Sequence, residues 1–556
     1  MKRRNFLKIL PPLGITPFVV NGLPMRPFAN RTLAKIMSTC DGVEDRVLVL
    51  IQLNGGNDGL NAVIPVEQYD LYANLRPSIR IPNTGTNKYI DLDNTLASPD
   101  RVGLHPAMLS MKQMYDDGRA SIVQAAGYAD MNQSHFKGAD LWLTGGDGTA
   151  VNNSINSGWM GRSLQAMYPD VLGVPTANNP DPLGIQLGSP NPSLGFHTET
   201  EHQNVITLSG QDAGGFYSLI QTIGGMPMTN IPDSDYGDEI EYIMGVELST
   251  SLYAQRISAT FNAGSNSTAA AYPAPNSNTL ADQLKTVARL IKGGCKTKIF
   301  LCNMGGFDTH GDQIIEGVTT TGDHANLLRK LSDATKVFFD DLKNLGLDDQ
   351  VVACTFSEFG RCAEENGSFG TDHGTLAPMF LFGKNIQAGI VGTNVNLTNL
   401  TNDDQLQGVQ NDYRQVFATL LQNWLGANNF VLEQTMFDGY AKLPVVDTAA
   451  VAGPECYLGG TTSAWDTYQR KRTLSVFPNP ARVSTEVGYE STASFEARLT
   501  LHSLGGSVIS SVSARVVAGS NSFQLDVATL PTGAYFVRFE NKISGQVEVM
   551  KLNVVR

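Results

Sequence analysis

The chain has 556 residues and a formal net charge of -13 at pH 7, with 42% hydrophobic and 17% charged residues. This length exceeds what one small core needs, so we expect two or more domains. The sequence shows no basic stripe, and its acidic balance excludes a nucleic-acid-binding surface, because phosphate contacts need clustered lysines and arginines.

The first 44 residues indicate an export address rather than a folded domain. The stretch KRRNFLK at residues 2–8 precedes a short apolar run from Ile9 to Val20. This pattern resembles a twin-arginine signal, which implies the twin-arginine translocase as a partner; an ordinary secretory signal or a merely basic start is the alternative. No other stretch approaches ~20 continuous apolar residues, so we expect no permanent membrane span.

Residues 45–455 alternate short apolar runs with amphipathic stretches, which predicts a doubly wound α/β domain. Continuous apolar runs are typical of a parallel sheet that is covered on both faces. The expected strands are Val47–Leu53, Ala120–Ala125, Lys298–Cys302, Val351–Thr355 and Met379–Phe382. The expected helices are Ala281–Lys292, Leu327–Leu342 and Asp412–Leu425. A loop-rich insertion is expected at about 178–279, with one helix near Asp238–Gln255.

After a linker at 456–472, residues 473–556 contain seven short strand-like runs, most of them separated by Gly or Asn. This spacing predicts a small all-β sandwich. The pieces FPNPA, LPTGAYFVRF and KLNVVR resemble the type A sorting domain of the type IX secretion system. The resemblance implies that this machinery delivers the chain to the cell surface or the medium. A carbohydrate-binding or immunoglobulin-like sandwich is the alternative.

Polar residues follow the first two expected strands of the α/β domain. Asn54 and Asp58 lie in NGGNDGLN after the first strand, where they either bind a metal or only cap the turn. Ser134 and His135 precede a helix that continues through Trp142. A helix N-terminus favours negative charge, so Ser134 is a candidate nucleophile and His135 a candidate substrate contact. Alternatively, Ser134 is only an N-cap.

The densest group of candidate ligands lies between residues 305 and 373. It comprises Asp308 and His310 in GGFDTH, Glu358 in SEFGR, and Asp372 and His373 in GTDHG. These oxygen and imidazole donors suit a divalent metal ion such as Zn, Mn or Ca. Arg361 is a candidate clamp for a tetrahedral anion. Because an open α/β sheet builds its site at the carboxyl ends of strands, we expect these side chains to converge.

The order of these features is similar to that of the alkaline-phosphatase-like superfamily, which includes phosphatases, sulfatases and cofactor-independent phosphoglycerate mutases. The resemblance implies a first metal position at Asn54 or Asp58, a nucleophile at Ser134 and later ligands among the 308–373 group. Over most of residues 45–450 the chain more closely resembles an exported bacterial family of unknown function, through NGGNDGLN, SHF, GWMGR, GGFDTH, SEFGR and GTDHG. Phe359 stands where that superfamily's second metal would need a histidine, so one metal, another metal or a lost activity all stay open.

Three functional hypotheses follow. The leading one is an exported metal-dependent hydrolase of phosphate or sulfate esters on small molecules or glycans, with Ser134 as its nucleophile. The second is a non-catalytic surface protein that uses the same fold to bind a polysaccharide or a partner. The third is an oxidoreductase. It is disfavoured because the sequence has no GxGxxG after the first strand and no haem CxxCH motif. The six cysteines include no CxxC pair, which disfavours a thiolate metal site.

Overall fold

The computed structural model divides the chain into two compact units, residues 31–456 and residues 1–30 with 457–556. It describes residues 18–20, 23–25, 45–149, 155–168, 171, 173, 175–177, 179–189, 191–198, 204–208, 250–448, 474–477, 481–491, 494–503, 508–542 and 547–554. The expected linker lies outside these residues. Of the expected export signal, only the antiparallel pair β1 (Phe18–Val20) and β2 (Leu23–Met25) is described.

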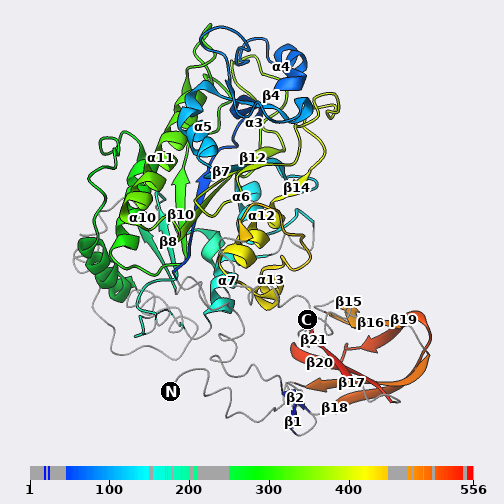
Figure 1. Ribbon diagram of the computed structural model, residues 1–556. Helices are drawn as coiled ribbons and strands as arrows, with labels where there is room; N and C mark the ends of the chain where they lie inside the picture. Colours follow the sequence, from blue (N-terminus) through cyan, green and yellow to red (C-terminus); the bar gives the residue numbers. More distant parts are fainter. Residues whose placement is uncertain are drawn as a thin grey trace. The chain divides into compact units, whose positions relative to one another are not determined.

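The larger unit is built on one mixed sheet (Figure 1). Within the described residues its strand order is β13-β7-β12-β11-β3-β10-β8-β9, and β14 also pairs with β7. The strands are β3 (Val47–Leu53), β7 (Ala120–Gly127), β8 (Gly184–Leu187), β9 (Val205–Leu208), β10 (Ile299–Met304), β11 (Val351–Phe356), β12 (Ala377–Phe382), β13 (Gly389–Val391) and β14 (Asn411–Asp412). All five strands expected from the sequence are present.

Helices cover both faces of this sheet, as the doubly wound prediction requires. Successive residues of a strand point to opposite faces. Val49 and Ile51 of β3 accordingly belong to one core cluster, and Leu48 and Leu50 belong to another. The first cluster includes α5 (Leu109–Asp116), α10 (Thr279–Lys292) and α11 (Asp323–Leu345). The second includes α6 (His135–Thr144), α7 (Trp159–Met167), α12 (Tyr413–Thr419), the π-helical turn η7 (Leu420–Trp424) and α13 (Asn429–Thr435).

Strand β12 differs from the parallel pairing that the sequence predicts. β3 pairs in parallel with β10 and β11, whereas β12 is antiparallel to both β11 and β7. A strand buried on both faces is continuously apolar in either direction, so its sequence does not reveal the reversal. The reversal brings the start of β12 to the edge where β3, β10 and β11 end. Residues just before Ala377 can therefore meet the loops that follow those three strands.

Shorter elements complete the larger unit. A small antiparallel sheet has the order β4-β6-β5. The short elements are α3 (Gly59–Ala62), β4 (Val63–Pro65), η2 (Val66–Gln68), α4 (Tyr69–Leu75), β5 (Ile90–Asp91), η3 (Ser98–Asp100), β6 (Val102–Leu104), η4 (Pro106–Met108) and η6 (Leu194–Phe196). Of the helix expected near Asp238–Gln255, the part before residue 250 lies outside the described residues, and residues 250–263 are helical.

The smaller unit confirms the all-β prediction for the C-terminal block. Its described strands form an antiparallel three-stranded sheet, β15-β16-β19, and an antiparallel four-stranded sheet, β18-β17-β20-β21. They are β15 (Leu474–Phe477), β16 (Ser484–Ser491), β17 (Phe495–Ser503), β18 (Val508–Val516), β19 (Gly519–Asp526), β20 (Gly533–Asn541) and β21 (Val547–Val554). Tyr489 of β16 stacks on Phe539 of β20, so the two sheets share one core.

The described part of the chain contains no helix with both the length and the apolar character that crossing a bilayer requires. Cys295, Cys302, Cys354 and Cys362 are free thiols. Cys40 and Cys456 lie outside the described residues.

Candidate metal centre

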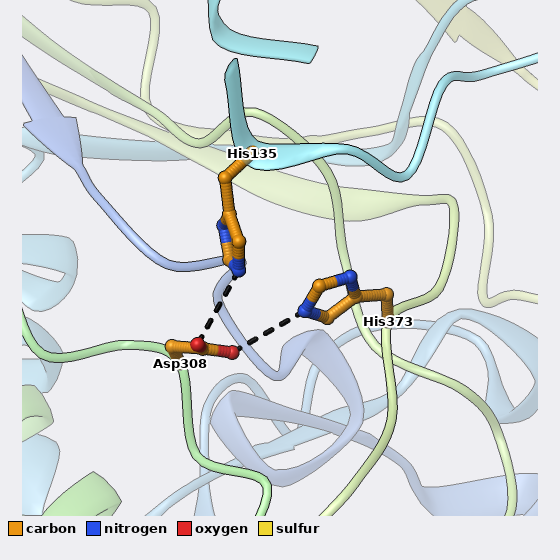
Figure 2. A group of neighbouring side chains, drawn as sticks. All are labelled: His135, Asp308 and His373. Atoms are coloured by element: carbon orange, nitrogen blue, oxygen red, sulfur yellow. Dashed lines mark hydrogen bonds and ion pairs between the residues drawn. The ribbon is translucent and has the colours of Figure 1, made fainter. Parts of the chain in front are cut away.

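Three histidines surround one carboxylate at the edge where β3, β10 and β11 end. Asp308 follows β10, and His135 begins α6; the Nε2 atom of His135 lies 3.3 Å from Oδ2 of Asp308. Nε2 of His310 lies 3.2 Å from Oδ1 of Asp308, and Nε2 of His373 lies 3.3 Å from the same oxygen. Figure 2 shows the rings of His135 and His373 pointing at Asp308 from different segments. The three rings thus turn the same nitrogen toward one carboxylate.

The other nitrogen of each ring meets an acceptor. The Nδ1 atom of His135 lies 2.9 Å from Glu358 Oε1, and that of His310 lies 2.9 Å from Asp372 Oδ1. Nδ1 of His373 lies 2.8 Å from the carbonyl oxygen of Gln133. A carbonyl oxygen only accepts, so Nδ1 of His373 carries the proton, and a neutral ring then has its lone pair on Nε2. Metal-binding histidines are held by this kind of outer hydrogen bond.

The charges of the group fit a cation. Partial burial lowers the pKa of His373, which favours its neutral ring. Burial alone would raise the pKa of Asp308, but Arg361 and the neighbouring histidines hold it below its usual value, so this group is a carboxylate. The neutral His373 ring therefore sets a lone pair against a carboxylate oxygen at 3.3 Å. A divalent ion between these atoms would satisfy both, and one donor atom each from His135, Asp308 and His373 lies within 4.8 Å of the others.

Glu358 connects His135 to the loop after β3. It is buried, and its Oε1 accepts a hydrogen bond of 2.7 Å from the backbone N–H of Gly55 in the loop after β3. The same oxygen meets His135, so Glu358 joins the β3 loop to that ring. Position 55 needs a glycine because the backbone of Asp308 lies against it. The φ of Gly55 is +123°, and a Cβ there would lie 2.2 Å from the backbone nitrogen of Asp308.

Arg361 is buried and ties several loops to Asp308. Its Nε donates to the carbonyl of Gly56 at 2.8 Å, and its Nη1 donates to the carbonyl of Thr371 at 2.9 Å. Its Nη2 lies 2.7 Å from Asp308 Oδ1 and also donates to backbone carbonyls of Gly55 and Phe307. Each guanidinium nitrogen has an acceptor here, so Arg361 positions Asp308 and does not present a free fork to a ligand.

Three other residues chosen from the sequence lie around the cluster. Ser134 is the N-cap of α6, directly before His135; it is exposed, and its hydroxyl does not cap the helix. Asp372 is 64% exposed, and hydrogen bonds from Asn366 and His310 lower its pKa. Asn54 follows β3, and its amide donates to the side-chain oxygen of Asn303 at 3.4 Å.

Asp58 lies in a separate buried ion pair. Nη1 of Arg76 reaches both of its carboxylate oxygens, at 2.8 and 2.7 Å, and both side chains are fully buried. Burial by itself would raise the pKa of Asp58, but the charge of Arg76 lowers it below the usual value. The sequence did not indicate Arg76 as a partner of Asp58, because an arginine at the end of a short helix belongs to no motif. Gln313, which also contacts Asp58, lies three residues after the motif GGFDTH, and that position was its only signal.

Comparison with known protein families gives one match in the larger unit and one in the C-terminal block. Residues 240–426, which include Asp308, His310, Glu358 and His373, match the family described as "Protein of unknown function (DUF1501)". Residues 475–553 match the "Secretion system C-terminal sorting domain". The resemblances to a family of unknown function and to a type IX sorting domain are confirmed over these segments. The sorting domain marks the chain for export to the cell surface or the medium. No curated protein matches the chain.

Solved structures give weaker likenesses. PorZ, a surface component of the type IX secretion system of Porphyromonas gingivalis, matches at 15% identity and a TM-score of 0.13, over 17% of this chain and 13% of PorZ. This chain thus spans only a small part of PorZ. A protein of the alkaline phosphatase superfamily from Vibrio parahaemolyticus matches at 10% identity and a TM-score of 0.29, over 93% of this chain and 84% of that one. A sulfatase from Pseudoalteromonas sp. matches at 9% identity and a TM-score of 0.30, over 89% of this chain and 87% of the sulfatase. We infer no chemistry from TM-scores this low.

Proposed function

We propose that this protein is an exported metal-dependent hydrolase of phosphate or sulfate esters, with Ser134 as its nucleophile. One observation carries the proposal: three imidazole Nε2 atoms face Asp308 at the sheet edge, and Ser134 directly precedes one of those imidazoles. His135, His373 and Asp308, whose donor atoms lie within 4.8 Å of one another, would hold the ion. His310, whose Nε2 lies 3.2 Å from Asp308 Oδ1, would complete the ligand set. Three nitrogen ligands and one carboxylate suit zinc or manganese better than calcium, which prefers oxygen ligands alone.

A bound divalent ion supplies electrostatic stabilisation for a tetrahedral anion and lowers the pKa of an adjacent hydroxyl. The protein's own residues do the rest. Ser134 lies at the N-terminus of α6, where the helix dipole favours negative charge on its oxygen. Its attack would release the alcohol of the ester and leave the phosphate or sulfate on Oγ. Water would then hydrolyse this serine ester and restore the hydroxyl.

The outer residues keep the ligands in place during these steps. Glu358 and the carbonyl of Gln133 fix the tautomers of His135 and His373, so that Nε2 of each ring faces inward. Arg361 orients Asp308 and offsets part of its charge. In this proposal Arg361 acts through Asp308 and the loops, and Asp58 and Asn54 support the loop after β3.

A non-catalytic surface protein with a structural cation is the second candidate. One observation favours it: among the described residues, no side chain that could serve as a general base hydrogen-bonds the hydroxyl of Ser134. The same ligand set would then stabilise loops for binding a polysaccharide or a partner.

Hydrolysis of 4-nitrophenyl phosphate and 4-nitrophenyl sulfate by the purified, metal-loaded protein tests the proposal. We expect turnover that a chelator abolishes, and a loss of at least about 10³-fold in Ser134→Ala with unchanged metal binding. Turnover that survives in Ser134→Ala would contradict the serine mechanism. A protein that binds metal yet hydrolyses neither ester would favour the second candidate.

A further inference from the structure

One buried glutamine connects the loops that form the candidate metal centre. Gln313 lies between β10 and α11 and is fully buried. Its side-chain oxygen accepts hydrogen bonds from Thr309 Oγ1 at 3.1 Å and from Thr371 Oγ1 at 3.0 Å. Its side-chain nitrogen donates to Asp58 Oδ2 at 2.6 Å. A single amide thus joins the segments that follow β3, β10 and β11.

Both threonines adjoin candidate ligands. Thr309 stands between Asp308 and His310, and Thr371 stands two residues before His373. The backbone N–H of Thr371 also donates to the carbonyl of Thr309 at 3.1 Å. Because both hydroxyls share one acceptor atom, the amide sets the separation of the two ligand-bearing segments. With the two segments so placed, the ring centroids of His310 and His373 lie 4.6 Å apart.

The charge of Asp58 fixes which way the amide points. Asp58 is paired with Arg76 and is therefore a carboxylate, which only accepts hydrogen bonds. The NH₂ group of Gln313 must face it, which leaves the amide oxygen, with its two lone pairs, for the two threonine hydroxyls. Leucine at position 313 would leave both hydroxyls without this acceptor. Glutamate there would place one carboxylate against another.

We propose that Gln313 is a positioning residue for the metal centre, which sets the spacing of His310 and His373 through Thr309 and Thr371. The inference rests on the metal-binding part of the proposed function. Outer partners of metal ligands typically contribute about 10–100-fold in metal affinity, and Gln313 acts one step further out but on two ligand segments together.

Calorimetric titration of Zn²⁺ into the metal-free full-length protein tests this role, since nitrogen and oxygen sites bind zinc more tightly than manganese or iron. We expect Gln313→Leu to weaken Zn²⁺ binding by about 10–100-fold. Gln283→Leu is a matched control: Gln283 is also buried, and its amide bonds the backbone N–H and carbonyl of Asn303 at 2.9 and 2.8 Å. This control should lose stability and keep the wild-type Zn²⁺ affinity.

An exchange of charge separates positioning from general stability. Gln313→Glu alone should weaken Zn²⁺ binding strongly, because its carboxylate faces Asp58. Asp58→Asn combined with Gln313→Glu restores complementarity: the glutamate accepts from both threonines and from the new asparagine amide. We expect this double variant to recover most of the affinity that Gln313→Glu loses.

The outcomes distinguish this inference from the proposed function. A wild-type protein that binds no Zn²⁺ contradicts both. A wild-type protein that binds Zn²⁺, together with wild-type affinity in Gln313→Leu, contradicts only the role of Gln313. Equal losses in Gln313→Leu and Gln283→Leu, or a double variant as weak as Gln313→Glu, contradict it as well, because affinity would then follow stability alone.

Discussion

At the scale of single residues, the side chains around Asp308 fall into two kinds. His135, His310 and His373 face it through Nε2, whereas Glu358 and Asp372 meet only the far nitrogen of a ring. The sequence indicated all of these residues, because acidic and imidazole groups after strands are typical of a site. It assigned Glu358 and Asp372 as ligands alongside His310 and His373, because spacing alone does not say which ring nitrogen points inward. It assigned His135 as a substrate contact and not as a ligand.

Glu358→Gln tests this division of roles. The amide keeps the size of the side chain but removes the charge that holds the proton on Nδ1 of His135. We expect Zn²⁺ affinity to fall about tenfold, measured by calorimetric titration. His373→Ala should lose more, because it removes a ligand atom, and Asp372→Asn less, because Asp372 is exposed to solvent. Equal affinities for Glu358→Gln and the wild type would contradict the role given to Glu358.

At the scale of elements, the loop after β3 depends on a glycine that another backbone touches. Gly55→Ala should destabilise the protein by about 2 kcal/mol or more and weaken Zn²⁺ binding, since its Cβ would meet Asp308. Gly85→Ala is the control: its φ is +81°, and nothing lies within 4 Å of its Cβ. It should cost only about 1 kcal/mol and leave the affinity unchanged. Urea denaturation measures the free energy of unfolding of both variants, and calorimetric titration measures their Zn²⁺ affinity. Equal losses of stability in Gly55→Ala and Gly85→Ala would contradict the role given to Gly55.

The ion pair beneath this loop gives a prediction about pH. Arg76 lowers the pKa of Asp58, so the pair stabilises the fold above the ordinary value of 3.8, and this stability is lost as pH falls below it. Arg76→Met leaves a buried carboxylate unpaired and should cost about 3–5 kcal/mol at pH 7. The difference from the wild type should shrink as pH falls from 7 toward 3.8 and below, because burial raises the pKa of the unpaired Asp58 in the variant. Urea denaturation across pH measures this difference. A difference independent of pH would count against the ion pair.

Much of this element structure could be predicted from the sequence. The predicted limits of Val47–Leu53 coincide with β3, because an apolar run followed by NGG has a clear end. The direction of β12 and the pairing of Asp58 with Arg76 could not be predicted. Both depend on contacts between segments far apart in the chain, and neither leaves a local pattern.

At the scale of the whole molecule, each unit has its own core, and the sorting domain lies wholly in residues 457–556. Removal of these residues should leave the Zn²⁺ affinity and melting temperature of the larger unit unchanged. In a bacterium with a type IX secretion system, the shortened chain should stay in the periplasm, as immunoblots of cell fractions would show. Delivery of the shortened chain to the surface would contradict an address in the C-terminal block.

The proposed metal centre requires that His135, His310, His373 and Asp308 hold one divalent ion. Anomalous diffraction at the zinc edge, from crystals of the zinc-loaded protein, tests it most directly. We expect a peak about 2.0–2.2 Å from Nε2 of each histidine and from an oxygen of Asp308. A zinc-loaded crystal with no peak between these atoms, or with its peak at Asp58, would contradict it.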